Sequence, residues 1–307
     1  MRVIFVFLPR AEAMDFAGPI QAFHEANRFG GGYTLVYAGV SPELPTEQGF
    51  WLTRLVPLPE PRKDDLVIVP GGPEATRGAV SASTLAWLRR AARAGARVGS
   101  VCTGAFVLGA AGLLDGKECT THWSRTKDLA RRFPKARVLE NRLFVTDGRL
   151  TTSAGIASGV DMALALIEEA HGPRVASLAA REMVVYVRRD GAHRQESVYL
   201  DYRGHIHPGV HRVQDYLAAH PEEPASLSRL ASLAAMSVRS LTRRFHEATG
   251  LTVHAFRTRA RLERARDLLK SPELTLEAVA GRCGFADARQ LRRLWQSAYG
   301  EPPSAAR

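Results

Sequence analysis

The chain has 307 residues, of which 45% are apolar and 24% charged, and this composition is typical of a globular protein large enough for two domains. No apolar run has the length of a membrane span, and three cysteines without Cys-X-X-Cys spacing argue against a disulfide framework, so we expect a cytoplasmic protein with no signal peptide and no membrane partner. The net charge of +11 favours an anionic polymer as partner without requiring one.

The first 190 residues alternate between short apolar runs and amphipathic segments. The apolar runs predict strands at 3–8, 33–40, 66–69 and 97–101, and the amphipathic segments predict helices at 15–29, 83–94, 103–114, 156–169 and 175–187, with a hairpin at 137–152 that turns at Asp147-Gly148. Strands that are buried on both faces and separated by helices are typical of a mostly parallel sheet. The sequence therefore predicts a flavodoxin-like α/β sandwich as the N-terminal domain, residues 1–190.

Residues 100–104, Ser-Val-Cys-Thr-Gly, are the most informative point of this domain, because a predicted strand ends there in a sharp turn into a helix. The turn has the form of a nucleophile elbow and places Cys102 at a helix N-terminus. The helix dipole and the free amides there stabilise a thiolate, so we expect the pKa of Cys102 to be lowered. Three roles are open to Cys102: the wall of a ligand pocket, a redox-sensitive thiol, or a buried structural cysteine.

After the last predicted helix of this domain the sequence turns polar and loses its period, and we place a linker at 191–206. The histidines His205, His207 and His211 are spaced as HxHxxxH, but no cysteine or carboxylate completes a metal site at a fitting distance along the chain. We therefore predict no metal and no cofactor. Residues 207–307 form the second domain, which we predict to be all-α with two helix-turn-helix motifs.

The first helix-turn-helix is predicted at 227–250, with a break at Met236 and with Ser237 placed to cap the second helix. The residues predicted to pack inward are Leu230, Leu233 and Ala234 on the first helix and Val238, Leu241 and Phe245 on the second. The residues predicted to share the open face of the second helix are Arg239, Thr242, Arg243 and His246. Such a face suits the major groove of DNA, because the arginine guanidinium group forms bidentate hydrogen bonds with guanine edges and with phosphates.

Residues 276–300 repeat this pattern with one extra residue in the turn. Leu230, Ala234 and Met236 match Val279, Cys283 and Phe285, and Leu241, Phe245 and Gly250 match Leu291, Trp295 and Gly300. The open face is again basic and consists of Arg289, Arg292, Arg293 and Gln296, while Asp287 and Gln290 resemble a capping box. One copy alone is equally well explained by an amphipathic helix pair with a solvated basic face, but two matched copies make that interpretation unlikely.

We therefore expect the second helix of each copy to bind in the major groove of DNA, at adjacent segments roughly 34 Å apart, and we call these two helices the reading heads. The predicted DNA contacts are Arg239, Thr242, Arg243, Arg289, Gln290, Arg292 and Arg293. The region from about His207 to Arg307 resembles the DNA-binding domain of the AraC/XylS family of transcription regulators, through LASLAAMSVRSLTRRF, RLERARDLLKSPELTLEAVAGRCGF and LRRLWQSAYGEPPSAAR. This resemblance implies sequence-specific binding to promoter DNA, with RNA polymerase as a further partner.

The first 190 residues or so resemble the class I glutamine amidotransferase-like superfamily, in its PfpI-like branch, through MDFAGPIQAF, VIVPGG, SVCTGAFVLGAAGLLDG, TTHW and TTSAGIASGVDMALALI. Together the two halves resemble the GlxA-type subfamily of AraC regulators, in which such a domain senses a small molecule. The resemblance implies a homodimer formed through the N-terminal domain and a small nitrogenous metabolite as effector.

Hydrolytic members of that superfamily need a base beside the thiol, commonly a histidine directly after the cysteine, and here that position is Thr103. By the resemblance Asp15 falls where relatives place a glutamate near the thiol, and we expect the shorter acid to reach it less well. His122 is either a second candidate base or a packed or capping histidine. We predict an effector pocket rather than an enzyme, with backbone donors at Gly71, Gly72 and Thr103. The residues predicted to line it are Asp15, Gly71, Gly72, Cys102, Thr103 and His122.

The sequence as a whole predicts a transcription regulator of the activator type, in which an effector shifts the population of molecules able to reach promoter DNA. One competing interpretation is a cysteine-dependent hydrolase or amidase, or a thiol redox sensor, with a DNA-binding appendage. Another is an architectural DNA-binding protein without a ligand, which the 190-residue α/β domain argues against.

Overall fold

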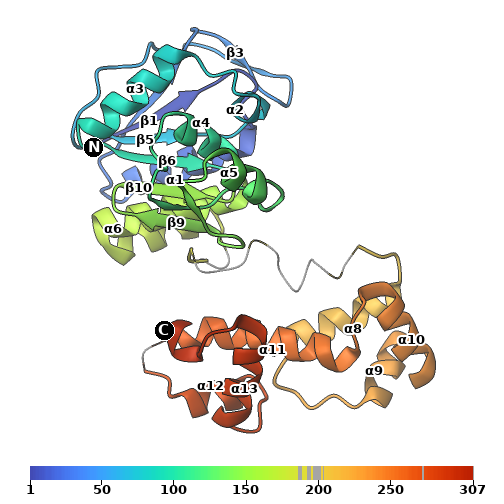
Figure 1. Ribbon diagram of the computed structural model, residues 1–307. Helices are drawn as coiled ribbons and strands as arrows, with labels where there is room; N and C mark the ends of the chain where they lie inside the picture. Colours follow the sequence, from blue (N-terminus) through green and yellow to red (C-terminus); the bar gives the residue numbers. More distant parts are fainter. Residues whose placement is uncertain (186–188, 192–194, 196–201, 203, 272, 307) are drawn as a thin grey trace. The chain divides into compact units, whose positions relative to one another are not determined.

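The computed structural model describes residues 1–185, 189–191, 195, 202, 204–271 and 273–306 (Figure 1). The chain divides into two compact units, Met1–Gln195 and Glu196–Arg307, and each unit is considered by itself below. This division lies within the linker predicted at 191–206, of which most residues lie outside the described part of the chain. No helix among the described residues is long and apolar enough to cross a membrane.

The N-terminal unit is built on a six-stranded sheet with the strand order β2-β1-β5-β6-β10-β9. The strands are β1 (Arg2–Phe7), β2 (Thr34–Gly39), β5 (Leu66–Val69), β6 (Arg97–Val101), β9 (Phe144–Asp147) and β10 (Leu150–Ser153). All neighbouring pairs are parallel except β9 and β10, which form an antiparallel edge. The predicted mostly parallel α/β fold is thereby confirmed, and two of its strands, 66–69 and 97–101, have the predicted bounds.

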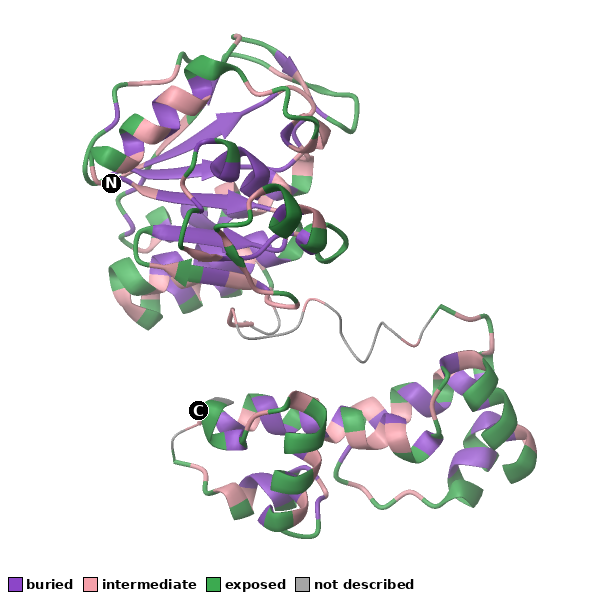
Figure 2. Ribbon diagram, in the orientation of Figure 1, coloured by how far each residue is buried: buried purple, intermediate pink, exposed green. Residues whose placement is uncertain are grey.

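Helices cover both faces of this sheet, because successive residues of each strand point to opposite sides. Val3, Phe5 and Phe7 of β1 pack with α1 (Ala13–Arg28) and α6 (Ala157–Glu182) in one cluster. Ile4 and Val6 pack in a second cluster on the other side. The helices of that side are α2 (Pro73–Arg77), α3 (Ala82–Arg93), α4 (Gly104–Ala110) and α5 (Thr126–Arg132). Figure 2 shows the central strands buried between these two helical layers.

Several short elements were not predicted from the sequence. They are β3 (Leu44–Pro45), β4 (Trp51–Leu52), β7 (Glu118–Cys119), β8 (Arg137–Val138) and the 3-10 helix η1 (Trp123–Arg125). The hairpin predicted at 137–152 is wrong in its first part, because Arg137-Val138 pairs in parallel with β7 and only β9 and β10 form the hairpin. Asn141 lies between them with φ of 59°, a left-handed conformation that interrupts an extended chain.

The two helices predicted at 156–169 and 175–187 are the two parts of a single kinked helix, α6, with a sharp kink between them. Gly172 has φ of 81° and ψ of 169°, outside the helical region, and Pro173 follows it. Glycine adopts this conformation without strain, and proline restarts the helix because it needs no N–H partner in the first turn. The second part ends at Glu182, earlier than predicted, and residue 187 lies outside the described residues.

The C-terminal unit is all-α. Its elements are α8 (Pro208–Ala219), α9 (Leu227–Ala234), α10 (Val238–Thr249), α11 (Val253–Leu269), α12 (Leu276–Arg282), α13 (Ala288–Tyr299) and the 3-10 helix η2 (Pro303–Ala306). Two separate apolar clusters hold it together, one around α8, α9 and α10 and one around α12 and α13. The long helix α11 joins the two, because Phe256 near its start belongs to the first cluster and Leu269 at its end belongs to the second (Figure 1).

The two helix-turn-helix copies keep the same capping pattern. Gly250 and Gly300 end the second helix of each copy in the left-handed conformation, with φ of 70° and 73°. In the turns, Ala235 with φ of 54° stands where the second copy has Gly284 with φ of 76°. The extra residue of the second copy is therefore Ala286, immediately before the cap residue.

Two residues that were predicted to pack inward are exposed. Leu233 is 38% exposed and Val238 is 40% exposed. The buried stripe of α9 is Leu230, Ala231 and Ala234, and at about 100° per residue Leu233 lies about 110° from its centre. Val238 is the first residue of α10, so its side chain lies at the end of the helix and beyond the core that Leu241 and Phe245 fill.

Candidate effector site and nucleic-acid interface

The predicted elbow is present at the carboxyl end of β6. Cys102 has φ of 55°, and α4 begins two residues later at Gly104. A side chain at Gly104 would meet the carbonyl group of Val69 on β5, with its Cβ at 3.0 Å from the Val69 carbonyl carbon. Glycine therefore lets the helix start directly against the neighbouring strand, and this contact forces the turn that presents Cys102.

Asp15 of α1 is the buried centre of the site. Its side chain is fully buried, and its Oδ2 accepts a hydrogen bond from the Gly71 amide at 3.1 Å while its Oδ1 accepts one from the Ile156 amide at 2.8 Å. The Cys102 thiol also donates to this carboxylate. Burial raises the pKa of Asp15 to about 6, and the two backbone hydrogen bonds oppose this shift only in part.

The prediction of a lowered pKa for Cys102 is wrong. Burial raises the pKa of its thiol far above the ordinary value, and the negative charge of Asp15 raises it further. A hydrogen bond from the Thr103 amide lowers it, but desolvation and the carboxylate outweigh this bond. Asp15 does reach the thiol, because the hydrogen bond between Asp15 and Cys102 is formed.

The three predicted backbone donors lie in the site, and each already has an acceptor. The Gly71 amide donates to Asp15, the Gly72 amide donates to the Thr103 hydroxyl at 2.9 Å, and the Thr103 amide donates to the Cys102 sulfur. A Cβ at Gly71 would lie 2.5 Å from Asp15 Oδ2, so only glycine fits there. The arrangement is internally satisfied, and a ligand that uses these donors has to displace their present acceptors.

Gly155 and Ile156 complete the site and were not predicted as site residues. A Cβ at Gly155 would lie 2.8 Å from the Cys102 sulfur, and Ile156 has φ of 46° and ψ of −107°. A positive φ is a strained conformation for a β-branched residue, and it directs the Ile156 amide at Asp15. The Ile156 side chain is 43% exposed, so it lies at the open edge of the site. Only Gly155 in TTSAGIASG gave a sequence signal for this loop.

His122 has the capping role that was one of its two predicted roles. It precedes η1, accepts a hydrogen bond from the Ser124 amide at 3.4 Å, and its Nδ1 lies 2.9 Å from the Ser124 hydroxyl. Burial, with the nearby Arg125, lowers the pKa of His122. Within the described part of the chain no hydrogen bond joins its ring to Cys102. Its neighbour Thr121 contacts the elbow instead, through a hydroxyl that donates to the Cys102 carbonyl at 2.7 Å.

The chain that leaves the α/β unit is anchored beside the elbow. The Gln195 side-chain amide donates to the carbonyls of Thr121 and Arg142, each at 2.9 Å. Arg189 donates to the buried carboxylate of Asp161 on α6, with its Nη2 at 2.6 Å. Thr121 therefore bonds to Cys102 through its hydroxyl and to Gln195 through its carbonyl, and this connects the elbow to the end of the unit. The sequence gave no signal for this contact.

The predicted DNA-contact residues lie on the open faces of α10 and α13. The exposed side chains of these faces are Arg239, Thr242, Arg243, His246, Arg289, Arg292, Arg293 and Gln296. Ser237 and Asp287 cap the two helices as predicted, by accepting from the amides of Ser240 and Gln290. The Gln290 side chain is half-buried and accepts from the Ala286 amide at 2.8 Å, so its oxygen takes part in the cap.

Most of the arginines on these two faces are not neutralised. Arg243 forms an ion pair with Glu247 at 3.6 Å. Arg239, Arg289, Arg292 and Arg293 form no ion pair with any described carboxylate. Unpaired guanidinium groups on a short capped helix are available for phosphates and guanine edges.

Comparison with protein-family models assigns both halves of the chain. Residues 1–169 match the model of the DJ-1/PfpI family, and residues 230–307 match that of a helix-turn-helix domain. The HTH-type transcriptional regulator CdhR of Pseudomonas aeruginosa is 31% identical over 304 residues, which are 98% of this chain and 89% of that protein. The HTH-type transcriptional regulator GbdR of P. aeruginosa is 35% identical over 240 residues, 78% of this chain, and the match spans only 65% of its length.

The chain also resembles an enzyme and a further regulator. An isonitrile hydratase of Pseudomonas putida is 32% identical over 183 residues, 60% of this chain and 78% of that enzyme. The crystal structure of an AraC family transcriptional regulator from P. putida covers 59% of this chain and 98% of its own, with a TM-score of 0.54 and 22% identity, which supports the fold. CdhR, whose match covers almost the whole of this chain, is an HTH-type transcriptional regulator. The chain therefore belongs to the DJ-1/PfpI family, among the HTH-type transcriptional regulators that join this domain to a helix-turn-helix domain of the AraC type.

Proposed function

We propose that this protein is a sequence-specific DNA-binding transcription regulator, of activator type, whose α/β unit senses a small effector. The observation that carries the proposal is the pair of matched helices α10 and α13, each capped at both ends and each presenting arginines without ion pairs among the described residues. Two such faces in one unit suit two successive segments of the major groove. Promoter DNA is therefore the proposed partner.

The proposed effector site is the group around Asp15 and Cys102. Its buried carboxylate is charged at neutral pH, since its pKa is about 6, and a nitrogenous effector with a positive charge or N–H donors would complement it. Ile156 at the open edge offers an apolar contact. The hydrogen bonds that join Thr121 to the Cys102 carbonyl and to the Gln195 side chain would couple effector binding to the end of the unit. An effector that favours one arrangement of these bonds shifts the population able to bind DNA.

The proposal extends to the assembly in which the regulator acts. We propose a cytoplasmic homodimer formed through the α/β unit, because two copies double the number of reading heads at one promoter. RNA polymerase is the proposed further partner, since an activator has to act on the enzyme that starts transcription.

A cysteine-dependent hydrolase is not favoured by this site. Its nucleophile would be the thiolate of Cys102, but burial and Asp15 keep the thiol protonated by raising its pKa. The position after the cysteine is Thr103, whose hydroxyl donates to the Gly72 carbonyl at 3.1 Å and offers no base. We therefore propose that the α/β unit binds its effector without turning it over.

Removal of one arginine from each recognition helix tests the proposed function. We expect Arg239→Ala and Arg289→Ala each to weaken binding to the preferred duplex by about 1 to 3 kcal/mol and to relax the preference at one base pair. The preferred duplex is first selected by fluorescence anisotropy from promoter-sized DNA upstream of its own and neighbouring genes, at several salt concentrations.

The control variant is Arg131→Ala, on α5 of the α/β unit, whose side chain is 78% exposed and which we expect to leave the affinity unchanged. A scrambled duplex of the same length separates base contacts from phosphate contacts. Unchanged affinity in both recognition-helix variants would refute the assignment of these faces. An equal loss on the preferred and the scrambled duplex would show that the arginines contact phosphates only.

A further inference from the structure

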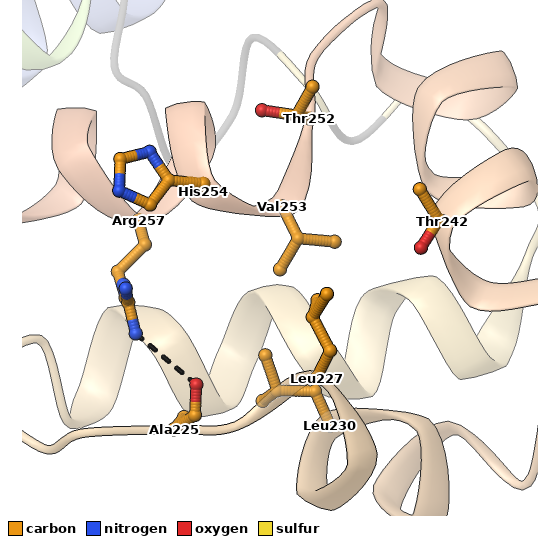
Figure 3. Close-up of a pocket in the computed structure, with 8 residues that line it drawn as sticks. All are labelled: Ala225, Leu227, Leu230, Thr242, Thr252, Val253, His254 and Arg257. Carbon is orange, nitrogen blue, oxygen red and sulfur yellow. Dashed lines mark hydrogen bonds between the residues drawn. The ribbon is translucent and has the colours of Figure 1, made fainter. Parts of the chain in front are cut away.

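A pocket of about 210 Å³ lies within the first helix-turn-helix copy, between α9, α10 and the start of α11. Figure 3 shows that the side chains of Val253 and Leu227 point toward one another across it, with Thr242 of α10 at one side. Its lining residues are Ala225, Leu227, Leu230, Thr242, Thr252, Val253, His254 and Arg257. This pocket is separate from the Asp15 site, and it shares only Thr242 with the open face of α10.

The body of the pocket is apolar. Leu230 and Val253 form its floor as members of the first apolar cluster, whereas the Leu227 side chain is 46% exposed at the rim. A dry apolar cavity of about 150 Å³ is large enough to hold a benzene molecule. The pocket therefore has room for one aromatic ring, or a branched alkyl group of the same size, with a short substituent.

One side of the pocket carries positive charge. The Arg257 guanidinium donates to the Ala225 carbonyl at 3.3 Å, a long hydrogen bond, and none of the described carboxylates forms an ion pair with it. His254 lies one turn before Arg257, and α11 begins at Val253, so the positive end of its dipole is at the pocket. An anionic group placed here would be stabilised by the guanidinium group and by the helix dipole.

The second copy of the repeat shows which residue leaves the space open. At the offset that matches Leu230 to Val279, Ala225 corresponds to Leu274. Leu274 packs against the second apolar cluster, and Ala225 packs against the first with a much smaller side chain. The pocket therefore has an alanine in its lining at a position where the other copy of the same fold accommodates a leucine.

We propose that this pocket is a second small-molecule site and binds a carboxylate with a compact apolar body, such as an aryl-acetate. The apolar body would lie among Leu227, Leu230 and Val253, and the carboxylate would lie at Arg257. Thr242 lines the pocket and also stands on the open face of α10, so a bound molecule touches the predicted DNA-reading helix directly. The site is independent of the effector proposed for the α/β unit.

The test is a titration of the full chain, without DNA, with phenylacetate and with its neutral analogue phenylacetamide, followed by protein NMR. We expect saturable binding of phenylacetate and at least about tenfold weaker binding of the amide, because the neutral amide cannot form the charge-assisted hydrogen bond to Arg257. Arg257→Gln should remove most of that preference. Ala225→Leu should abolish binding, and Leu233→Ala, an exposed position on α9 outside the pocket, is the matched control and should leave it unchanged.

Intermolecular NOEs between the phenylacetate ring and the Val253 methyl groups in the unaltered chain locate the ligand without any variant. The proposal is overturned if phenylacetate shows no saturable binding, if the amide binds equally well, or if NOEs to Val253 are absent. It is also overturned if the folded Ala225→Leu variant binds as the unaltered chain does. Since no DNA is present, none of these outcomes depends on the proposed regulatory function.

Discussion

Replacement of Phe245 by alanine is expected to lower the free energy of unfolding of the first helix-turn-helix copy by about 3 to 5 kcal/mol. Phe245 is fully buried and packs edge-on against Phe256 of α11, with ring centroids 5.6 Å apart. Truncation leaves a cavity and removes an aromatic pair that contributes about 0.5 to 1.5 kcal/mol beyond its burial. Because this contact fixes α10 to α11, the specific affinity for DNA should fall together with the stability.

Hydrogen exchange on the full chain measures this loss locally, in peptides from α9 and α10, and compares it with peptides from α13. The matched control is Val238→Ala on the same helix, which removes a side chain that is 40% exposed and should change the local stability by no more than about 0.5 kcal/mol. If Phe245→Ala and Val238→Ala had similar effects, the first cluster would not be packed around Phe245. Unaltered exchange in α13 is expected, since that helix belongs to the second cluster.

The second large effect concerns the pH dependence of stability. Between pH 4 and pH 7 the unaltered chain should lose about 2.4 kcal/mol of unfolding free energy relative to its Asp15→Asn variant. The pKa of Asp15 is raised from 3.8 to about 6, so the folded state holds a proton that the unfolded state has released. Stability therefore falls as pH rises through this window. The pKa shift of about 2 units corresponds to about 3 kcal/mol in full at 1.36 kcal/mol per unit, and about 2.4 kcal/mol of it falls between pH 4 and pH 7, because the unfolded carboxyl group is already more than half ionised at pH 4.

The measurement is denaturant unfolding of both proteins at pH 4, 5, 6 and 7. Only the difference between the two proteins is interpreted, because every other ionisable group is common to both and cancels. Asparagine has one acceptor oxygen for the amides of Gly71 and Ile156, so the variant is less stable in absolute terms, but this loss does not depend on pH. If the difference in unfolding free energy between the two proteins stayed constant to within about 1 kcal/mol across this pH range, Asp15 would not have the raised pKa of a buried carboxyl group.

Much of the fold could be predicted from local sequence patterns. The strand 66–69 is a continuous apolar run, Leu-Val-Ile-Val, and such a run indicates a buried strand without any tertiary information. The strand 97–101 has two valines and ends at the turn into the next helix. The repeated helix-turn-helix was equally visible, because its buried positions recur at a fixed offset. The elbow was predicted because a strand, a cysteine and a glycine follow one another directly along the chain.

Most of the predictions that were wrong or missing concern features that depend on contacts between residues far apart in sequence. The pKa of Cys102 could not be predicted from its helix terminus, since the groups that raise it are Asp15 and the surrounding protein. Likewise the roles of Ile156 and Gln195 exist only after α6 and the end of the unit pack beside the elbow. Asn141 interrupts the predicted hairpin through a backbone conformation that the apolar pattern does not encode.

The two clusters of the C-terminal unit have a consequence for how such a regulator changes over evolutionary time. Each reading helix rests on its own set of apolar residues, and the two sets share only the continuous helix α11. A substitution that retargets one head, for example at Arg239, therefore leaves the core under Arg289 unaffected. Under the proposed function, a duplicated gene would acquire a new promoter one half-site at a time, and each intermediate would stay folded and keep the half of its proposed recognition that has not yet changed.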